Sequence, residues 1–417
     1  MPLMFKEEKC FLADDEHTQS RSLGEEGASS VKGRWREYKL CQVCTLINGR
    51  AYSKTELLDE GKYPVLRVGN FFTNNHWYYS DMELAPDKYC DDGDLLYAWS
   101  ASFGPRIWAG RKVIFHYHIW KVLPNAKLID KRFLFFWFLW DADHIRADQG
   151  TGTTMMHVAK GSMDNREILL PSLSEQERIV AILDEAFEGI AAARTNVEMS
   201  LTKANDLLDV ELQLLLPPCQ EGWKQLTLAE VASDYGRGKS KHRPRNDPKL
   251  YGGAYPFVQT GDVRNAKQYV TTYSQTYNDL GLSQSKLWPK GTLCVTIAAN
   301  IAETAILDFD ACFPDSVIGI VANPSKANTR FIEYQLRVAK AQLQAKGKGS
   351  AQDNINLGTF ETHTFSFPPL AVQEVLVERL DSIASLSASL TDVLLQKFIL
   401  LDELKQSLLN QAFSGSL

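Results

Sequence analysis

The sequence predicts an α/β (α+β) fold: two tandem, pseudo-symmetric mixed α/β domains separated by two long antiparallel coiled-coil helices. The chain repeats itself after about 190 residues. Each copy opens with short β-rich runs and closes with a long stretch of helical periodicity. The expected parts are an extension over 1–34, domains over 35–172 and 223–369, and helical segments over 173–222 and 370–417.

The repeat is clearest where each domain meets its long helix. Residues 171–177 read Pro-Ser-Leu-Ser-Glu-Gln-Glu, and residues 368–374 read Pro-Pro-Leu-Ala-Val-Gln-Glu. Gln176 thus recurs as Gln373, 197 residues later, while matched pairs nearer the start of each copy are 188 apart. The drift indicates small insertions in loops. A unit of this length is too long for a solenoid repeat, so the sequence indicates a duplicated globular module.

Each predicted domain contains short runs of β-branched and aromatic residues separated by Gly, Asn and Asp. This pattern is typical of strands, while segments 131–140 and 330–344 look helical. The strand candidates are 63–68, 95–99 and 112–120 in the first domain, and 255–260, 292–297 and 317–321 in the second.

The long segments carry an apolar stripe at coiled-coil spacing. Between Ser174 and Leu216 there is no Pro, and the only Gly is Gly189. A seam that starts at Val180 is apolar at nine of eleven positions, and one that starts at Val377 at eight of eleven. Such a helix is roughly 65 Å long at about 1.5 Å per residue. Neither stripe can be buried alone, so we expect the two helices to pack on each other; alternatively, each lies on its own domain.

Bulk composition indicates a globular protein of two or three domains, with 44% hydrophobic and 23% charged residues. Seven cysteines, an odd number, fit a reduced compartment better than a disulfide framework. The longest apolar run, 133–140, is too short to span a bilayer, and the early acidic residues do not resemble a signal peptide. We therefore expect a cytoplasmic protein with no membrane partner.

The charge is distributed unevenly along the chain. The net charge is −6, yet residues 173–222 carry −7, the first domain carries +1 and the second carries +5. The acidic residues therefore concentrate in the helical parts, and the domains can still present a basic surface to phosphate.

These motifs resemble the specificity subunits of type I restriction-modification systems. The segments 171–180 and 368–374 are similar to those that open each long helix in that family, although Val372 replaces the usual acidic residue. The ending at 404–415 also resembles the family, as do 255–263, 288–293 and 347–350 of the second domain. The resemblance covers about 35–417, and the first domain matches less closely than the second.

The resemblance implies a DNA-reading subunit that has no catalysis of its own. Each domain would grip one half of a split site in double-stranded DNA, with the halves on the order of one DNA turn, 34–36 Å, apart. The helices would dock two methyltransferase subunits at quasi-equivalent places. Motor-nuclease subunits would complete the complex. No cofactor is expected on this chain, because S-adenosylmethionine and ATP belong to those partners.

Two motifs suggest chemistry that the rest of the sequence does not support. Residues 236–240 read Gly-Arg-Gly-Lys-Ser, but a P-loop requires Gly at position 233, which is Ser. We interpret 237–245 as a basic loop for phosphate, with a plain solvated loop as the alternative. Cys41 and Cys44 have CxxC spacing, yet Ala229 and Ala232 replace them in the second copy, which indicates small core residues.

Other catalytic and metal-binding signatures are also missing. His116 and His118 alternate in a strand, but no third ligand is evident, so a structural role is favoured. Asn323-Pro324 is not followed by the Pro and aromatic residue of a methyltransferase signature. Pro86-Asp87 and Pro314-Asp315 lack the downstream acidic-x-Lys of a nuclease. The sequence therefore assigns no catalytic residue and no metal ligand.

Candidates for contact with DNA are polar and basic side chains in the predicted loops, because Arg and Lys read guanine and Asn and Gln read adenine. Equivalent loops at 149–153 and 346–350 offer backbone N–H groups to phosphate. In the first domain the candidates are Lys54, Arg67, Asn70, Trp99, Ser100, Arg106 and Lys112. In the second domain they are Arg237, Lys239, Lys241, Arg243, Arg245, Gln259, Arg264, Asn300, Lys346, Lys348 and Ser350.

The openings of the two helices are the predicted docking sites for partner subunits, at Gln176 and Glu177 and at Gln373 and Glu374. The polar seam residues Arg194, Glu211 and Lys405 hint at a register with a partner. Two other classes of function stay open on sequence alone. The chain could be a bivalent protein-interaction scaffold or, less favoured, a self-contained DNA-modifying enzyme.

Overall fold

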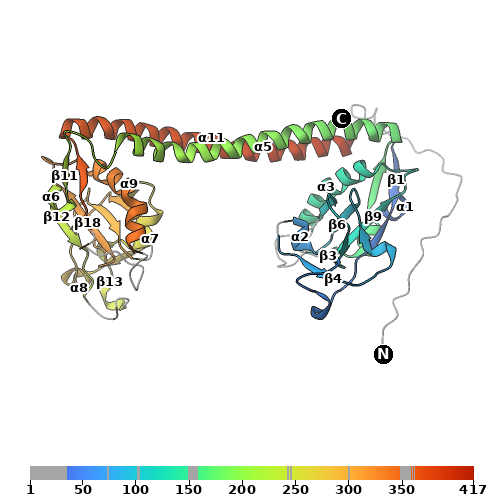
Figure 1. Ribbon diagram of the computed structural model, residues 1–417, viewed down its shortest axis with the longest axis horizontal. Coiled ribbons are helices and arrows are strands. Elements are labelled where there is room, and N and C mark those ends of the chain that lie inside the picture. Colours follow the sequence, from blue (N-terminus) through green and yellow to red (C-terminus); the bar gives the residue numbers. More distant parts are fainter. Residues whose placement is uncertain are drawn as a thin grey trace. The chain divides into compact units, whose positions relative to one another are not determined.

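The computed structural model describes residues 35–72, 75–100, 104–148, 158–241, 244, 247–298, 301–347, 358, 360 and 362–417 (Figure 1). Contacts divide the chain into two compact units. The first unit contains the chain up to Asn196 together with Lys397–Leu417, and the second contains Val197–Gln396. The predicted extension over 1–34 lies outside the described residues.

The first unit combines ten strands with short helices in its described part. The strands are β1 (Arg36–Lys39), β2 (Cys44–Asn48), β3 (Tyr63–Leu66), β4 (Tyr78–Ser80), β5 (Tyr89–Cys90), β6 (Leu95–Ala98), β7 (Gly104–Ile107), β8 (Val113–Phe115), β9 (Ile119–Pro124) and β10 (Glu167–Leu170). The helices are α1 (Leu40–Val43), η2 (Lys54–Glu56), α2 (Val68–Phe72), η3 (Pro86–Lys88), α3 (Lys131–Asp148) and α4 (Lys160–Asp164). The sheet orders are β2-β9-β6-β7, β4-β3-β8-β5 and β1-β10.

The described part of the second unit follows a similar plan. Its strands are β11 (Lys224–Leu226), β12 (Ala232–Arg237), β13 (Tyr251–Phe257), β14 (Tyr269–Val270), β15 (Gln275–Tyr277), β16 (Leu293–Thr296), β17 (Thr304–Leu307), β18 (Val317–Ala322) and β19 (Phe365–Phe367). Its short helices are α6 (Leu228–Val231), η4 (Pro248–Leu250), α7 (Thr260–Asn265) and α8 (Asp279–Ser283), with the longer α9 at Thr329–Gly347. The sheet orders are β12-β18-β16-β17-β14, β13-β15 and β11-β19.

Strand order shows that the two units are copies. The order β2-β9-β6-β7 matches β12-β18-β16-β17, and in both sheets these neighbours are antiparallel. The short helices α1 and α6 precede β2 and β12, and each helix begins with Leu, at Leu40 and Leu228. The outer pairs β1-β10 and β11-β19 each end where a long helix opens. The predicted fold class is confirmed.

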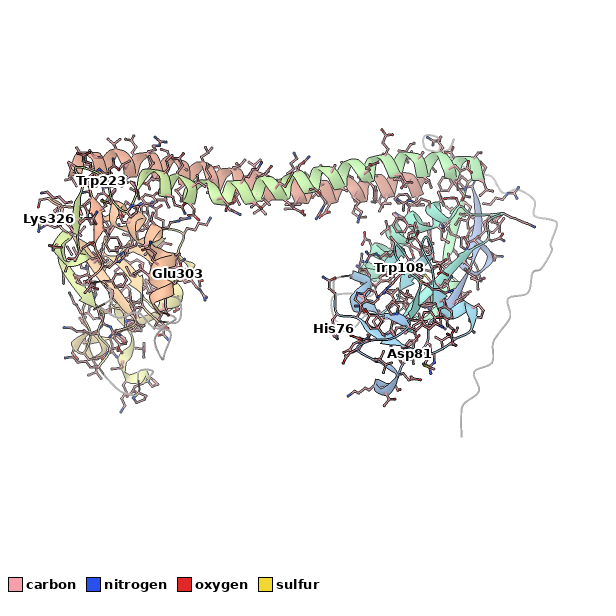
Figure 2. All side chains as sticks on the ribbon, in the orientation of Figure 1. His76, Asp81, Trp108, Trp223, Glu303 and Lys326 are labelled. Atoms are coloured by element: carbon pink, nitrogen blue, oxygen red, sulfur yellow. The ribbon has the colours of Figure 1, made fainter. Side chains whose placement is uncertain are left out.

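The central strand β6 of the first unit is buried on both faces. Leu95 and Tyr97 pack in one core cluster with Phe133 of α3. Leu96 packs in another cluster with Trp108, which Figure 2 labels. A strand covered on both sides reads as a continuous apolar run, which explains why residues 95–99 lack polar alternation.

In the second unit, β16 has the same arrangement. Leu293 and Val295 pack in one core cluster with Phe331 of α9. Cys294 lies between them in sequence and packs in another cluster with Trp288. Each domain is therefore a sheet with a helix on one face and a smaller apolar layer on the other.

The long helices are α5 (Leu173–Leu215) and α11 (Leu370–Ser414), of 43 and 45 residues. Within the first unit they run antiparallel, since Arg178 donates to the Leu417 carbonyl at 2.7 Å and Arg194 pairs with Asp402. Every predicted seam position of both helices is buried or half-buried. The predicted stripe is therefore the packing surface of the pair.

The second unit contains the remaining part of the helix pair, which is also antiparallel. The Ser387 hydroxyl donates to the Ala204 carbonyl at 2.6 Å, and Arg379 pairs with Glu211 at 3.1 Å. The three polar seam residues therefore have partners within this chain. Glu211 pairs with Arg379 in the second unit. In the first unit, Arg194 pairs with Asp402, and the Lys405 ammonium lies over the Phe187 ring at 5.3 Å. Their predicted role in the register with another protein is corrected, because each of them contacts the other long helix of this chain.

Candidate nucleic-acid interface and partner surfaces

A buried glutamine fixes the first domain to α5. The Gln176 side chain donates to the carbonyls of Leu128 and Pro171, at 2.9 and 3.0 Å. Its oxygen accepts from the Asp130 amide at 2.8 Å. The residue is 0% exposed. Gln176 therefore uses its hydrogen-bonding groups on the backbone that leads into α3 and on the backbone just before α5, and we call this arrangement the glutamine latch.

The second domain carries the same latch. Gln373 is also 0% exposed, donates to the carbonyls of Lys326 and Pro368 at 3.1 and 2.9 Å, and accepts from the Asn328 amide at 3.0 Å. Both glutamines were predicted to dock a partner subunit, and that prediction is wrong because neither side chain reaches the surface. Glu177 and Glu374 are exposed, so they remain predicted docking residues.

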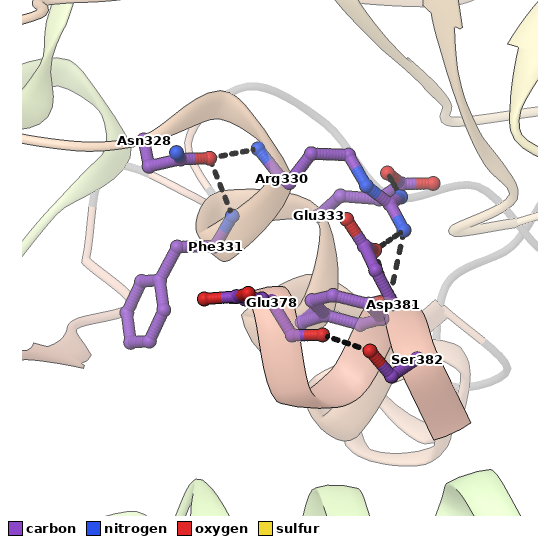
Figure 3. Close-up of polar contacts among 8 residues, drawn as sticks. Asn328, Arg330, Phe331, Glu333, Glu378, Asp381 and Ser382 are labelled. Carbon is purple, nitrogen blue, oxygen red and sulfur yellow. Dashed lines mark hydrogen bonds and ion pairs between the residues drawn. The ribbon is translucent and has the colours of Figure 1, made fainter. Parts of the chain in front are cut away.

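An arginine adds a second link between α9 and α11. Arg330 pairs with Glu333 and with Asp381 of α11, and donates to the Tyr334 hydroxyl at 2.7 Å (Figure 3). Tyr334 in turn donates to Asp381 at 2.6 Å. The side chains of Arg330 and Glu333 are only 13% and 10% exposed. Burial raises the pKa of Glu333, although Arg330 opposes that shift.

The first unit has a more exposed version of this link. Arg132 donates to Asp184 of α5 at 2.8 Å, and both side chains are 39% exposed. Asp130 begins α3 by accepting from the Arg132 and Phe133 amides, as Asn328 does for α9 (Figure 3). The two copies thus share caps, glutamine latches and arginine links, and differ in how deeply the arginine is buried.

Comparison with known proteins identifies the protein family to which both repeats belong. A family profile described as "Type I restriction modification DNA specificity domain" matches residues 32–198 and again residues 220–396. The chain belongs to this family.

Curated proteins support the assignment of the chain to the specificity family. The chain is similar to the EcoBI specificity subunit of an Escherichia coli type I restriction enzyme, with 19% identity over 94% of this chain and 88% of that protein. It is also similar to the MjaVIII specificity subunit of Methanocaldococcus jannaschii, with 24% identity over 71% of this chain and 73% of that protein.

Solved structures show the same fold as this specificity-family chain. One is from a study of complex assembly and conformational transition of the type I R-M system, with a TM-score of 0.73, 20% identity, and coverage of 92% and 98%. Another is the HsdS subunit from Thermoanaerobacter tengcongensis, with a TM-score of 0.56, 19% identity, and coverage of 94% and 100%.

In the first domain of this specificity-family chain, several candidate DNA contacts are exposed. Lys54 and Arg67 are on the surface, and Arg67 lies over the Tyr78 ring at 5.3 Å. Asn70 lies in α2 and donates to the His76 carbonyl at 2.6 Å, and Arg106 donates to the carbonyl of Phe71 in the same helix. Lys112 is also exposed, with its ammonium group 3.8 Å from the Asp91 carboxylate and over the Tyr89 ring at 4.8 Å.

The aromatic residues around the turn between β8 and β9 form a cluster. Trp99 is half-buried, donates to the Tyr117 carbonyl at 2.8 Å and stacks on Trp120. Ser100 is 4% exposed, so its predicted contact with a base is corrected. Tyr117 is 38% exposed and was not predicted. The prediction of one strand over 112–120 is wrong, because β8 ends at Phe115 and β9 begins at Ile119, so the His-Tyr-His run forms the turn between them. That run was the signal for Tyr117, since an exposed aromatic ring at a turn can stack on a base.

Cys44 is buried and Cys41 is half-buried, and the structural role of the histidine and cysteine pairs stays a prediction. Burial, with smaller contributions from His118 and Arg67, lowers the pKa of His116 to about 4, so the ring is neutral at pH 7. Burial raises the pKa of Cys44 to about 12, which disfavours the thiolate that metal binding requires. Within the described residues, no group of three or more His, Cys, Asp or Glu side chains could hold a metal ion.

The basic loop of the second domain begins on β12. Arg237 donates to the Asp315 carbonyl at 2.6 Å, and Lys239 and Lys241 are exposed beyond it. A side chain at Gly238 would meet the Phe313 carbonyl oxygen at 2.2 Å, so this Gly allows a close approach of two backbones. In the described residues the strand is followed by irregular backbone at 238–241 and 244, and the next helical element is the short η4, so this part of the chain lacks the strand-to-α-helix geometry of a P-loop.

The other candidates of the second domain lie on or near α7 and α9. Gln259 precedes α7 and donates to Gln275 at 2.7 Å, and Arg264 is exposed in its last turn. Lys346 lies in the last turn of α9. The remaining candidates lie outside the described residues; they are Arg243, Arg245, Asn300, Lys348 and Ser350.

Helix α11 has an exposed apolar face in the second unit. Val375, Leu386 and Val393 are 65%, 61% and 64% exposed, and their spacing places them on one side of the helix. A window of α11 has a mean hydropathy of 1.4 and is 6% buried, so the helix could cross a membrane by length and composition alone. The sequence prediction considered only unbroken apolar runs and missed this window. The opposite face of α11 packs on α5 in this unit.

Proposed function

We propose that this chain is the DNA sequence-recognition subunit of a type I restriction-modification complex. Each α/β domain reads one half of a bipartite DNA target, and the long helices dock methyltransferase subunits. The observation that carries the proposal is the duplicated glutamine latch. The same set of hydrogen bonds joins each of two diverged domains to its long helix. Matches of the family profile to both copies support it.

The DNA-reading surfaces are the exposed polar residues of each domain. In the second domain the basic segment from Arg237 to Lys241 supplies phosphate contacts, and Gln259 supplies an amide suited to adenine. In the first domain Arg67 and Tyr117 offer a cation and an aromatic ring. The two sets differ in chemistry, so one chain reads an asymmetric target.

The chain itself carries no catalysis in this proposal. Two methyltransferase subunits bind it, and S-adenosylmethionine and ATP act on the partner subunits, including a motor-nuclease where one is present. The complex works in the cytoplasm. The exposed apolar face of α11 supplies the surface for a methyltransferase, in place of the buried glutamines.

A methylome tests the proposed function. The chain and its neighbouring methyltransferase are expressed in a methylation-free host, and modified bases are sequenced directly, with a chain-deleted control. We expect a split motif with two defined halves and a fixed undefined spacer, absent from the control. Replacing residues 223–369 by the equivalent domain of a relative should change one half only. A methylome identical with and without the chain, although both proteins are soluble and associated, would favour the scaffold function.

The apolar face of α11 gives a second testable expectation. The double variant Leu386→Asp/Val393→Asp should weaken association with the methyltransferase at least about 100-fold, because each side chain buried in the complex contributes about 1.5–3 kcal/mol. Isothermal calorimetry measures the loss. Ser385→Asp/Gln396→Asp places the same charge at exposed polar positions of α11 and serves as the control. Equal affinities for both double variants would rule out docking on this face.

A further inference from the structure

A basic cleft lies in the second unit, at the place where the domain meets its part of the helix pair. It has a volume of about 570 Å³. Its walls are α9, the last turns of α5, the segment that follows α7, and the end of the turn between β16 and β17. Five of the lining residues are Lys or Arg and three are Asp or Glu, so cations are in excess.

Two of these cations are free to meet a ligand. Arg264 and Lys267 are exposed, and within the part of the chain that the structure describes neither has an ion-pair partner. Arg264 makes one weak contact, at 3.3 Å, with its neighbour Asn265. The fully engaged Arg330 lies in the wall of the cleft and serves the link to α11, so it is not available.

Two further cations sit in exchangeable pairs on α9. Arg337 pairs with Asp209 of α5 at 2.9 Å, and Lys340 pairs with Glu303 at 2.9 Å. These side chains are 30–59% exposed, and ion pairs at such positions contribute only about 0–1 kcal/mol. An incoming anion can therefore replace a carboxylate at little cost. Arg337 and Lys340 are three residues apart and share one helix face.

The first unit has no such cations at the equivalent positions. Arg132 and Arg330 are 198 residues apart, and the same offset relates Arg337 and Lys340 to Leu139 and Ala142 of α3. The cleft therefore accounts for part of the basic excess of the second domain over the first. The cations that α9 contributes to the cleft are therefore a property of one copy and not a feature of the duplicated scaffold.

We infer that this cleft binds backbone phosphates of the DNA that the second domain reads, with Arg264 and Lys267 as the first contacts. The inference rests on the proposed function and names a site for it. Helix α7 connects the candidate for base reading with the candidates for phosphate contact. Gln259 precedes the helix, Arg264 lies in its last turn, and Lys267 lies just beyond it. Phosphate contacts of this kind set the position of the domain on the duplex without reading sequence.

A free nucleotide fits the cleft less well than a DNA backbone. Tyr334 is the only aromatic residue in the lining, and its hydroxyl is held by Arg330 and Asp381. Among its described lining residues the cleft therefore offers no free aromatic surface for stacking a base. Its cations instead lie on two separate elements, the end of α7 with the segment after it and the face of α9, which suits successive phosphates along a strand.

The test uses the double variant Arg264→Gln/Lys267→Gln in the complex with its methyltransferase. DNA affinity is measured over a range of salt concentrations, on target and non-target DNA. Each phosphate contact contributes about 0.9 to the slope of log affinity against log salt, so we expect the slope to fall by about 2. Affinity should fall by a similar factor on both DNAs, and the methylated sequence should not change.

A matched control removes two positive charges elsewhere in the same unit. Lys224 and Lys326 are both exposed, and Figure 2 shows Lys326 on the side of the unit opposite to Glu303 of the cleft. Lys224→Gln/Lys326→Gln should change the slope by less than half as much. An equal change in both variants, or none in the cleft variant, overturns the inference.

Two other results also count against a phosphate site. A changed methylation motif means that Arg264 or Lys267 reads a base. Failure of the cleft variant to assemble with the methyltransferase, measured by size-exclusion chromatography, means that the cleft is a protein-docking surface. If the wild-type complex itself does not bind DNA specifically, the proposed function fails, and this outcome is distinct because it needs no variant.

Discussion

Replacing Arg330 by Ala should destabilise the second unit by about 3–5 kcal/mol at neutral pH, because removal of one partner leaves a buried charge uncompensated. The variant leaves Glu333, whose side chain is 10% exposed, without its ion-pair partner. It also removes one hydrogen-bond donor from Asp381 and one from the Tyr334 hydroxyl. Urea unfolding followed by tryptophan fluorescence, together with hydrogen exchange of α9, measures the loss.

The loss should depend on pH in a defined direction. Burial raises the pKa of Glu333 in the folded chain, and Arg330 opposes that rise, so the pKa rises further in the variant. A carboxyl with a raised folded pKa stabilises the fold below its unfolded pKa, and this stabilisation is lost as pH rises through the folded pKa. The deficit of Arg330→Ala should therefore shrink as pH falls from 7 towards the ordinary value of 4.5.

Two further variants separate the buried charge from lost packing. Arg330→Ala/Glu333→Gln should recover much of the stability at pH 7, since the stranded group is then neutral. Arg132→Ala removes the equivalent arginine of the first unit, where both partners are 39% exposed, and should cost less than about 1 kcal/mol. A deficit that is the same at both pH values, with no recovery in the double variant, would show that Glu333 is not its cause.

Replacing Gln373 by Leu should also destabilise the second unit, by about 3–5 kcal/mol. The change leaves the carbonyls of Lys326 and Pro368 and the amide of Asn328 without their partner. Each unsatisfied buried group costs about 1–3 kcal/mol. Amide exchange at Asn328 and in the first turn of α9 should speed up before global unfolding.

The adjacent exposed residue provides the control for this prediction. Glu374→Leu is a change at the next position of α11 and should alter stability by about 0.5 kcal/mol or less. Gln176→Leu should affect the first unit as Gln373→Leu affects the second. Similar stabilities of Gln373→Leu and Glu374→Leu would mean that the latch does not hold the domain.

The sequence alone predicted the repeat, the fold class and the helix pair, because these follow from periodicity. It did not predict what Gln176 and Gln373 do. The signal was present, since Gln176 stands four residues before the seam residue Val180 and so lies on the buried face of its helix. A polar residue at such a position must find partners inside the protein, which argues for a structural role.

The basic cleft could not be predicted, because it depends on packing between distant segments. Arg337 and Lys340 look like solvated residues of an amphipathic helix. Their importance follows only from the placement of α9 against α5, which brings Asp209 within 2.9 Å of Arg337. Arg264 was a candidate from its residue type, but Lys267 was not, and nothing in their local sequence separates the two.

The glutamine latch contacts the domains only through main-chain atoms: the carbonyls of Leu128 and Pro171, the amide of Asp130, and their counterparts in the second copy. Main-chain groups are the same whatever side chain a residue carries. The glutamine latch therefore does not depend on which side chains the domain carries at these contacts. A domain exchanged between relatives would keep the latch whatever its sequence there, whereas the arginine link would still require an arginine opposite Asp184 or Asp381.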